Sequence, residues 1–68
     1  MKMTNNELRA YEIGVKEANT QKRIVPACKS VKMNELMAEV KNGLLPLIIA
    51  YDKGVAHEIN RQTISEVM

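Results

Sequence analysis

A short phrase occurs twice in this chain, forty positions apart. Residues 10–15 read Ala-Tyr-Glu-Ile-Gly-Val, and residues 50–55 read Ala-Tyr-Asp-Lys-Gly-Val. Four of the six positions are identical, and a fifth exchanges one carboxylate for another. At the helical period, each copy carries a tyrosine beside a stripe of small residues, which lets a second helix approach closely. The repeat therefore predicts two similar helices packed on each other through matching Gly/Ala/Tyr faces. The residues expected at this contact are Ala10, Tyr11, Gly14, Ala50, Tyr51 and Gly54.

Apolar residues at helical spacing predict an all-α fold, a small three-helix domain that occupies residues 1–68. On the first helix, Leu8, Tyr11, Val15 and Ala18 share one face, with the small-residue stripe beside it. The second helix should cover one side of the repeated pair. The expected helices span about residues 5–19, 31–42 and 46–61, with a basic connector over 20–30 and a frayed tail over 62–68.

Local signals mark the helix ends. Thr4 and Glu7 form a capping box, in which each side chain can accept from the backbone N–H of the other residue. Gly43 suits the position after the second helix, and Pro46 suits the first turn of the third. Residues 24–26, Ile-Val-Pro, should be extended, because the residue before proline avoids the helical region.

Composition narrows the function classes. The chain has a single cysteine, Cys28, and a single histidine, His57, so no internal disulfide or metal framework is expected. His57 is expected to be exposed on its helix, and Cys28 half-buried in a turn. The carboxylates lie near bases along the helices rather than in pairs, which predicts neither a cofactor nor an enzyme. The longest apolar stretch has eight residues where a membrane span needs about 20, so we expect a soluble cytoplasmic protein.

Positive charge gathers in the first half of the chain. Residues 16–32 hold five cations against one carboxylate, Glu17. Such a segment can contact the phosphates of a nucleic acid or an acidic partner, or it can be an ordinary solvated loop. It lacks the interleaved aromatics typical of single-strand binding. The candidate contact residues are Lys16, Lys22, Arg23, Lys29 and Lys32.

Several apolar residues fall outside the predicted three-helix core. A cluster of exposed apolar side chains on so small a protein marks an interface with a partner or a second copy. The interface candidates are Ile13, Ile49, Ile64 and Val67.

A family resemblance adds a functional expectation. Arg9-Ala10 with Gly14, a basic connector with a Pro and Cys element at 26–28, and Tyr-Asp-Lys-Gly at 51–54 resemble the small ribosome modulation factor family and its phage and plasmid relatives. The chain departs from that pattern because Pro26 precedes Cys28, the family's tryptophans are missing, and residues 31–45 read as an inserted helix. The resemblance implies a small helical protein that binds ribosomal RNA or a ribosomal surface.

Three function classes follow. The first is a non-enzymatic regulatory protein of phage or mobile-element type that docks on a host protein or ribonucleoprotein complex such as the ribosome. The second is an inhibitor of a host defence complex, or a homo-oligomeric structural piece, that acts through exposed apolar residues. The third is a DNA-binding regulator, which is disfavoured because the helix that begins near Pro46 opens with Leu-Ile-Ile rather than with base-reading side chains.

Overall fold

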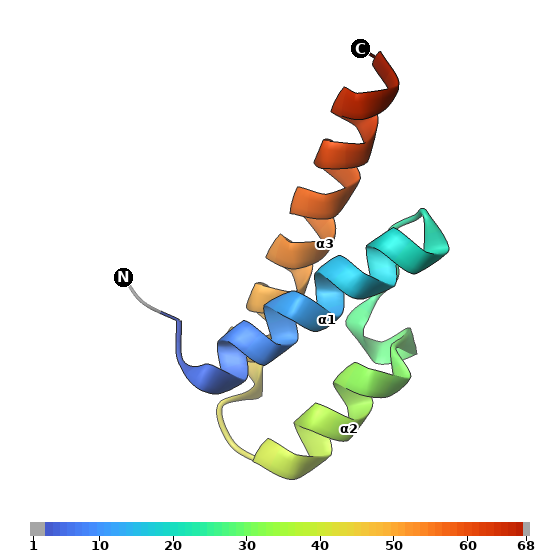
Figure 1. Ribbon diagram of the computed structural model, residues 1–68. Helices are drawn as coiled ribbons and strands as arrows, with labels where there is room; N and C mark the ends of the chain where they lie inside the picture. Colours follow the sequence, from blue (N-terminus) through green and yellow to red (C-terminus); the bar gives the residue numbers. More distant parts are fainter. Residues whose placement is uncertain (1–2, 68) are drawn as a thin grey trace.

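The computed structural model describes residues 3–67, and the side chains of residues 3–63. The elements are α1 (Asn5–Gln21), a short 3-10 helix η1 (Ala27–Lys29), α2 (Val31–Val40) and α3 (Leu44–Val67) (Figure 1). No strand occurs within residues 3–67. The predicted all-α architecture of three helices is confirmed.

Helices α1 and α3 cross with their backbones in contact at the two repeated glycines. A Cβ atom added at Gly14 would collide with the carbonyl oxygen of Tyr51. A Cβ added at Gly54 would collide with the carbonyl oxygen of Tyr11 in the same way. Only glycine fits at either position, so the packing predicted from the repeat is confirmed.

The two helices run in the same direction. The first turn of α1 lies beside residues 42–47, whereas Ala18 near its end accepts a hydrogen bond from Gln62, at 3.3 Å. The contacts of the two glycines also mirror each other. A Cβ atom added at Gly14 would lie 3.2 Å from the backbone nitrogen of Val55, and one added at Gly54 would lie 3.2 Å from that of Val15. Helices α1 and α3 are therefore related by a local two-fold axis that maps each residue onto the one forty positions later.

The small-residue stripe, rather than the row of larger residues beside it, is the most buried face of α1. Ala10, Gly14 and Ala18 are buried, whereas Leu8 is 46% exposed. Leu8, which the helical spacing placed on one face with Ala18, is therefore much less buried than Ala18. Because the backbones touch at the glycines, the stripe lies on the line of contact and the larger side chains are displaced to its flanks.

Helix α2 covers one flank of the pair, as predicted. Its Met33 and Leu36 are buried in one cluster with Leu47 and Tyr51 of α3. Ile13, which we expected outside the core, packs against this cluster. The expectation that Ile13 lies outside the three-helix core is therefore wrong, because α2 lies over that side of α1. Its role at an interface stays a prediction.

The capping box at the start of α1 is confirmed. Thr4 N–H donates to a Glu7 carboxylate oxygen at 2.8 Å, and Glu7 N–H donates to the Thr4 hydroxyl at 3.2 Å. Helix α1 continues two residues beyond the predicted end, and Lys22 then takes the left-handed conformation (φ 58°) and closes the helix through its N–H to the Ala18 carbonyl.

The ends of α2 and α3 also differ from the prediction. Helix α2 ends at Val40, because Lys41 already has a positive φ of 69°, so Gly43 (φ 65°) belongs to the turn that leads into α3. Helix α3 begins at Leu44, with Pro46 still in the first turn, where a missing N–H costs nothing. It continues to Val67, beyond the predicted end at residue 61, and no glycine or proline follows Gly54.

Replacing Gly14 by alanine should destabilise the protein, although alanine is the better helix former by about 1 kcal/mol. The new methyl group must separate the two backbones, and we expect a net loss of about 1–3 kcal/mol in the free energy of unfolding by urea. The exposed position Ala56 on α3 is the control, because Ala56→Gly should cost only the propensity difference. Unchanged or increased stability of Gly14→Ala would contradict the close crossing.

Candidate functional site

The connector between α1 and α2 is anchored by a buried tyrosine. The Tyr51 hydroxyl donates to the carbonyl oxygen of Val25 at 2.7 Å, and Val25 itself is only 7% exposed. Burial raises the pKa of the Tyr51 phenol above its usual value, and the nearby Glu17 carboxylate raises it further. Tyr51 therefore stays a neutral donor that holds the connector against α3.

Hydrogen bonds fix the rest of the connector. The η1 turn is closed by the Lys29 N–H, which donates to the Pro26 carbonyl at 2.9 Å. The buried Ser30 caps α2 by accepting from the Met33 N–H at 3.2 Å, and Asn34 donates from its side chain to the Cys28 carbonyl at 3.1 Å. The segment from Val25 to Ser30 therefore has a defined shape.

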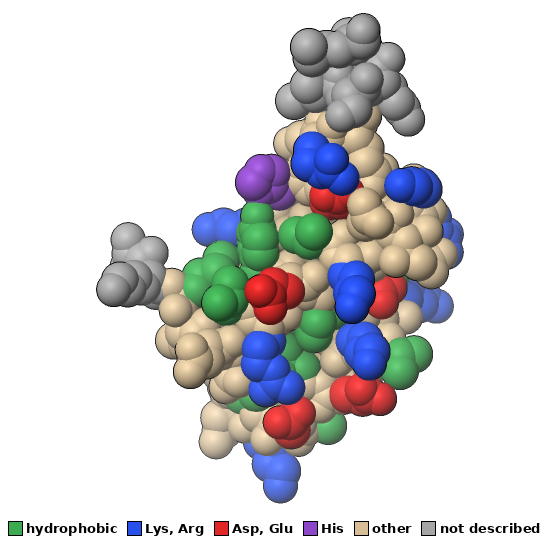
Figure 2. All heavy atoms as spheres, viewed as in Figure 1, with side chains coloured by type: hydrophobic (Ala, Val, Ile, Leu, Met, Phe, Trp, Pro, Cys, Tyr) green, Lys and Arg blue, Asp and Glu red, His purple; other side chains and the backbone are tan. Residues whose placement is uncertain are grey.

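Most of the predicted cations point away from the core. Their side chains are exposed, and Ile24 beside them is 69% exposed. Blue side chains lie along the right-hand edge of Figure 2, where Figure 1 places the connector. We use the name connector surface for Lys22, Arg23, Ile24, Lys29 and Lys32.

Lys16 lies in a different electrostatic setting. It lines a groove of about 300 Å³ between α1 and α2 together with Lys32, but Glu12 and Glu17 line the same groove. Arg9, at the same groove, pairs with Glu39 of α2 at 3.3 Å. Carboxylates of α1 thus lie beside Lys16, and of the cations in the connector surface only Lys32 shares its groove.

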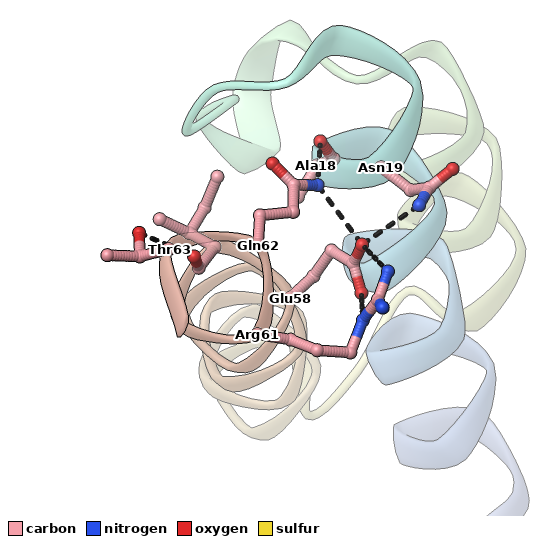
Figure 3. Close-up of polar contacts among 7 residues, drawn as sticks. Ala18, Asn19, Glu58, Arg61, Gln62 and Thr63 are labelled. Carbon is pink, nitrogen blue, oxygen red and sulfur yellow. Dashed lines mark hydrogen bonds and ion pairs between the residues drawn. The ribbon is translucent and has the colours of Figure 1, made fainter. Parts of the chain in front are cut away.

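A buried carboxylate that the sequence analysis missed lies at the far end of the α1 and α3 contact. Glu58 is 5% exposed and accepts from Asn19 at 2.9 Å, from Gln62 at 3.0 Å and from two nitrogens of Arg61 at 2.9 and 2.7 Å (Figure 3). These hydrogen bonds, that from Arg61 first, hold the pKa of Glu58 far below its usual value. The repeat could have indicated this burial. Its spacing of forty positions aligns Glu58 with Ala18, which lies on the buried face of α1.

The histidine and the cysteine are both exposed. The exposure of His57 was expected. Its contact with Tyr11 was not expected: the Tyr11 hydroxyl lies 2.5 Å from His57 Nδ1. Cys28 is exposed rather than half-buried, because it lies on the outer side of the η1 turn.

The interface candidates have different outcomes. Ile49 is 47% exposed, as predicted, and Leu45 one turn earlier is 66% exposed. The side chains of Ile64 and Val67 lie outside the described residues.

Searches for metal sites, membrane-spanning helices and similar proteins do not point to a function. Among the described residues, no group of histidine, cysteine and carboxylate side chains could hold a metal ion. None of the described helices has both the length and the apolar character needed to cross a bilayer. Comparisons with protein families, curated proteins and solved structures gave no match.

Removing the Tyr51 hydroxyl should loosen the connector. In Tyr51→Phe the buried Val25 carbonyl loses its donor, and we expect a loss of about 1–3 kcal/mol in the free energy of unfolding. Trypsin should also cut faster after Lys22 and Arg23. Tyr11→Phe is the matched control, since its hydroxyl is at the surface and its loss should affect neither quantity strongly. Equal effects of the two substitutions would show that Tyr51 does not anchor the connector.

The Glu58 network should make stability depend on pH in acid. Since folding lowers the pKa of Glu58, its contribution is complete above the unfolded-state pKa of about 4.3 and is lost as the pH falls towards the folded-state value. Urea unfolding at about pH 7 and about pH 3 should therefore show a larger loss for the natural protein than for Glu58→Gln. The same loss in both proteins would mean that the network does not favour the ionised carboxylate.

Proposed function

We propose that this chain is a non-enzymatic regulatory protein that docks on a large host ribonucleoprotein assembly, with the ribosome as the first candidate, through its connector surface. The observation that carries the proposal is the anchored connector, whose buried side holds Val25 and whose outer side presents Lys22, Arg23 and Lys29. RNA phosphates are the matching chemistry, because cations that neutralise them release condensed counterions.

The rigidity of the connector supports this proposal over a solvated loop. A flexible loop loses conformational entropy when it binds, whereas a segment already held by the Tyr51 and Ser30 hydrogen bonds has much less to lose. The exposed Ile24 between the cations adds an apolar contact that a loop selected only for solubility does not need.

The second candidate function is protein binding or self-association through exposed apolar residues. The neighbouring Leu45 and Ile49 on α3 favour it, since both are about half exposed or more. Leu8 of α1, 46% exposed, is a further apolar side chain at the surface. This surface would suit an inhibitor of a host complex or a homo-oligomer.

Co-sedimentation with purified ribosomes, measured at low and at high salt, distinguishes the two candidate functions. Reversing the connector charges with Lys22→Glu and Arg23→Glu should weaken binding and reduce the slope of log K against log salt by about 0.7–0.9 for each phosphate that the variant no longer neutralises. Lys53→Glu, an exposed cation on α3, is the charge-matched control and should change neither quantity strongly.

The variant Ile49→Lys shows which of the two surfaces contacts the ribosome. It should leave ribosome binding unchanged if the connector makes the contact. Loss of binding in Ile49→Lys with full binding in the Lys22→Glu and Arg23→Glu variant would favour the apolar surface instead. No binding of the natural protein at low salt would exclude the ribosome as the partner.

A further inference from the structure

The local two-fold axis gives the α1 and α3 pair two equivalent flanks, and the part of the chain that the structure describes covers only one of them. The axis maps Tyr11 onto Tyr51, and Glu17 onto His57. On the Tyr51 flank the connector packs in place, and Tyr51 is fully buried. On the other flank Tyr11 is only half-buried. The two flanks therefore share the same helix geometry, but the connector covers the Tyr51 flank and leaves the Tyr11 flank open.

The open flank forms a groove of about 330 Å³ between α1 and the second half of α3. Green side chains lie beside the histidine, drawn in purple, on this side of the molecule (Figure 2). We use the name Tyr11 groove for the site lined by Tyr11, Val15, His57, Glu58 and Arg61. Their counterparts across the axis are Tyr51, Val55, Glu17, Ala18 and Gln21.

The covered flank shows what kind of chain fits such a groove. Its occupant is an extended segment in which Val25 is buried and Pro26 has φ −61° and ψ 147°. The contact that orients it is the hydrogen bond from the tyrosine hydroxyl to the backbone carbonyl of Val25. Tyr11 can make the equivalent bond, because its hydroxyl can accept from His57 Nδ1–H and direct its own proton to a carbonyl.

The two flanks carry different charged side chains. On the covered flank the carboxylate is Glu17, and the occupying connector begins with Lys22 and Arg23. The open flank has His57 in place of Glu17 and Arg61 in place of Gln21. Its own carboxylate, Glu58, is buried and is bound by Arg61, Asn19 and Gln62, whereas the side chain of Arg61 stays 60% exposed at the mouth of the groove. An occupant of the open flank should therefore carry acidic residues where the connector carries basic ones.

We propose that the Tyr11 groove is a binding site for an extended segment of a partner protein, with an aliphatic residue against Val15, a backbone carbonyl that accepts from Tyr11, and acidic residues that face His57 and Arg61. The site lies on the flank opposite the connector surface, so it is a second contact of this protein rather than part of the first.

Peptide titration followed by backbone amide NMR tests this proposal. The probe is a capped peptide with the sequence of residues 22–27 in which Lys22→Glu and Arg23→Glu reverse the two charges. We expect shifts at Tyr11, Val15, His57 and Arg61, and at least fivefold weaker binding of the unaltered 22–27 peptide. Tyr11→Phe should weaken binding about two- to tenfold, as for loss of one hydrogen bond.

Val15→Glu should abolish the shifts, whereas Val31→Glu, at an exposed valine of α2, should leave them unchanged. Circular dichroism of each variant confirms that it is folded. The proposal is overturned if the charge-reversed peptide gives no shifts at millimolar concentration, or gives them around Tyr51. It is also overturned if a short RNA oligonucleotide binds the groove more tightly than the peptide, or if a second copy of the chain occupies it, seen as a doubled mass that Val15→Glu halves.

Discussion

The contact between the backbones of α1 and α3 at Gly14 and Gly54 determines most of this structure. Because each glycine lies against the carbonyl of the opposite tyrosine, the helices approach more closely than side chains normally allow. Close approach buries much of both helices with small residues, which suits a chain that has no phenylalanine or tryptophan for its core. It also forces the two tyrosines away from the line of contact to opposite flanks, where their surroundings decide their roles.

Those surroundings are where the symmetry of the pair ends. The connector and α2 cover one flank, so Tyr51 becomes a buried anchor with a neutral hydroxyl. The other flank keeps Tyr11 half exposed beside His57. A nearly identical local sequence therefore supports a structural residue in one copy and a surface residue in the other. Both surfaces that we propose as partner sites, the connector surface and the Tyr11 groove, lie on the flanks that this difference separates.

The sequence was sufficient to predict the features that depend on local periodicity. The three helices, the capping box at Thr4 and the glycine contact followed from residue spacing, because these are short-range properties. The packing of Ile13 against the core could not be predicted, since it depends on which side of α1 the second helix covers. Glu58 was overlooked for another reason: a charged residue is rarely buried, and only its alignment with Ala18 across the repeat indicated its position.

The most direct test of the glycine contact is a set of NOE measurements between α1 and α3. The structure predicts reciprocal cross-peaks, from the α-protons of Gly14 to the amide proton of Val55 and from the α-protons of Gly54 to the amide proton of Val15. Both should have similar intensity, because the local axis makes the two distances equal. Absence of both cross-peaks in the folded protein, or contacts that pair the start of α1 with the end of α3, would contradict the parallel crossing.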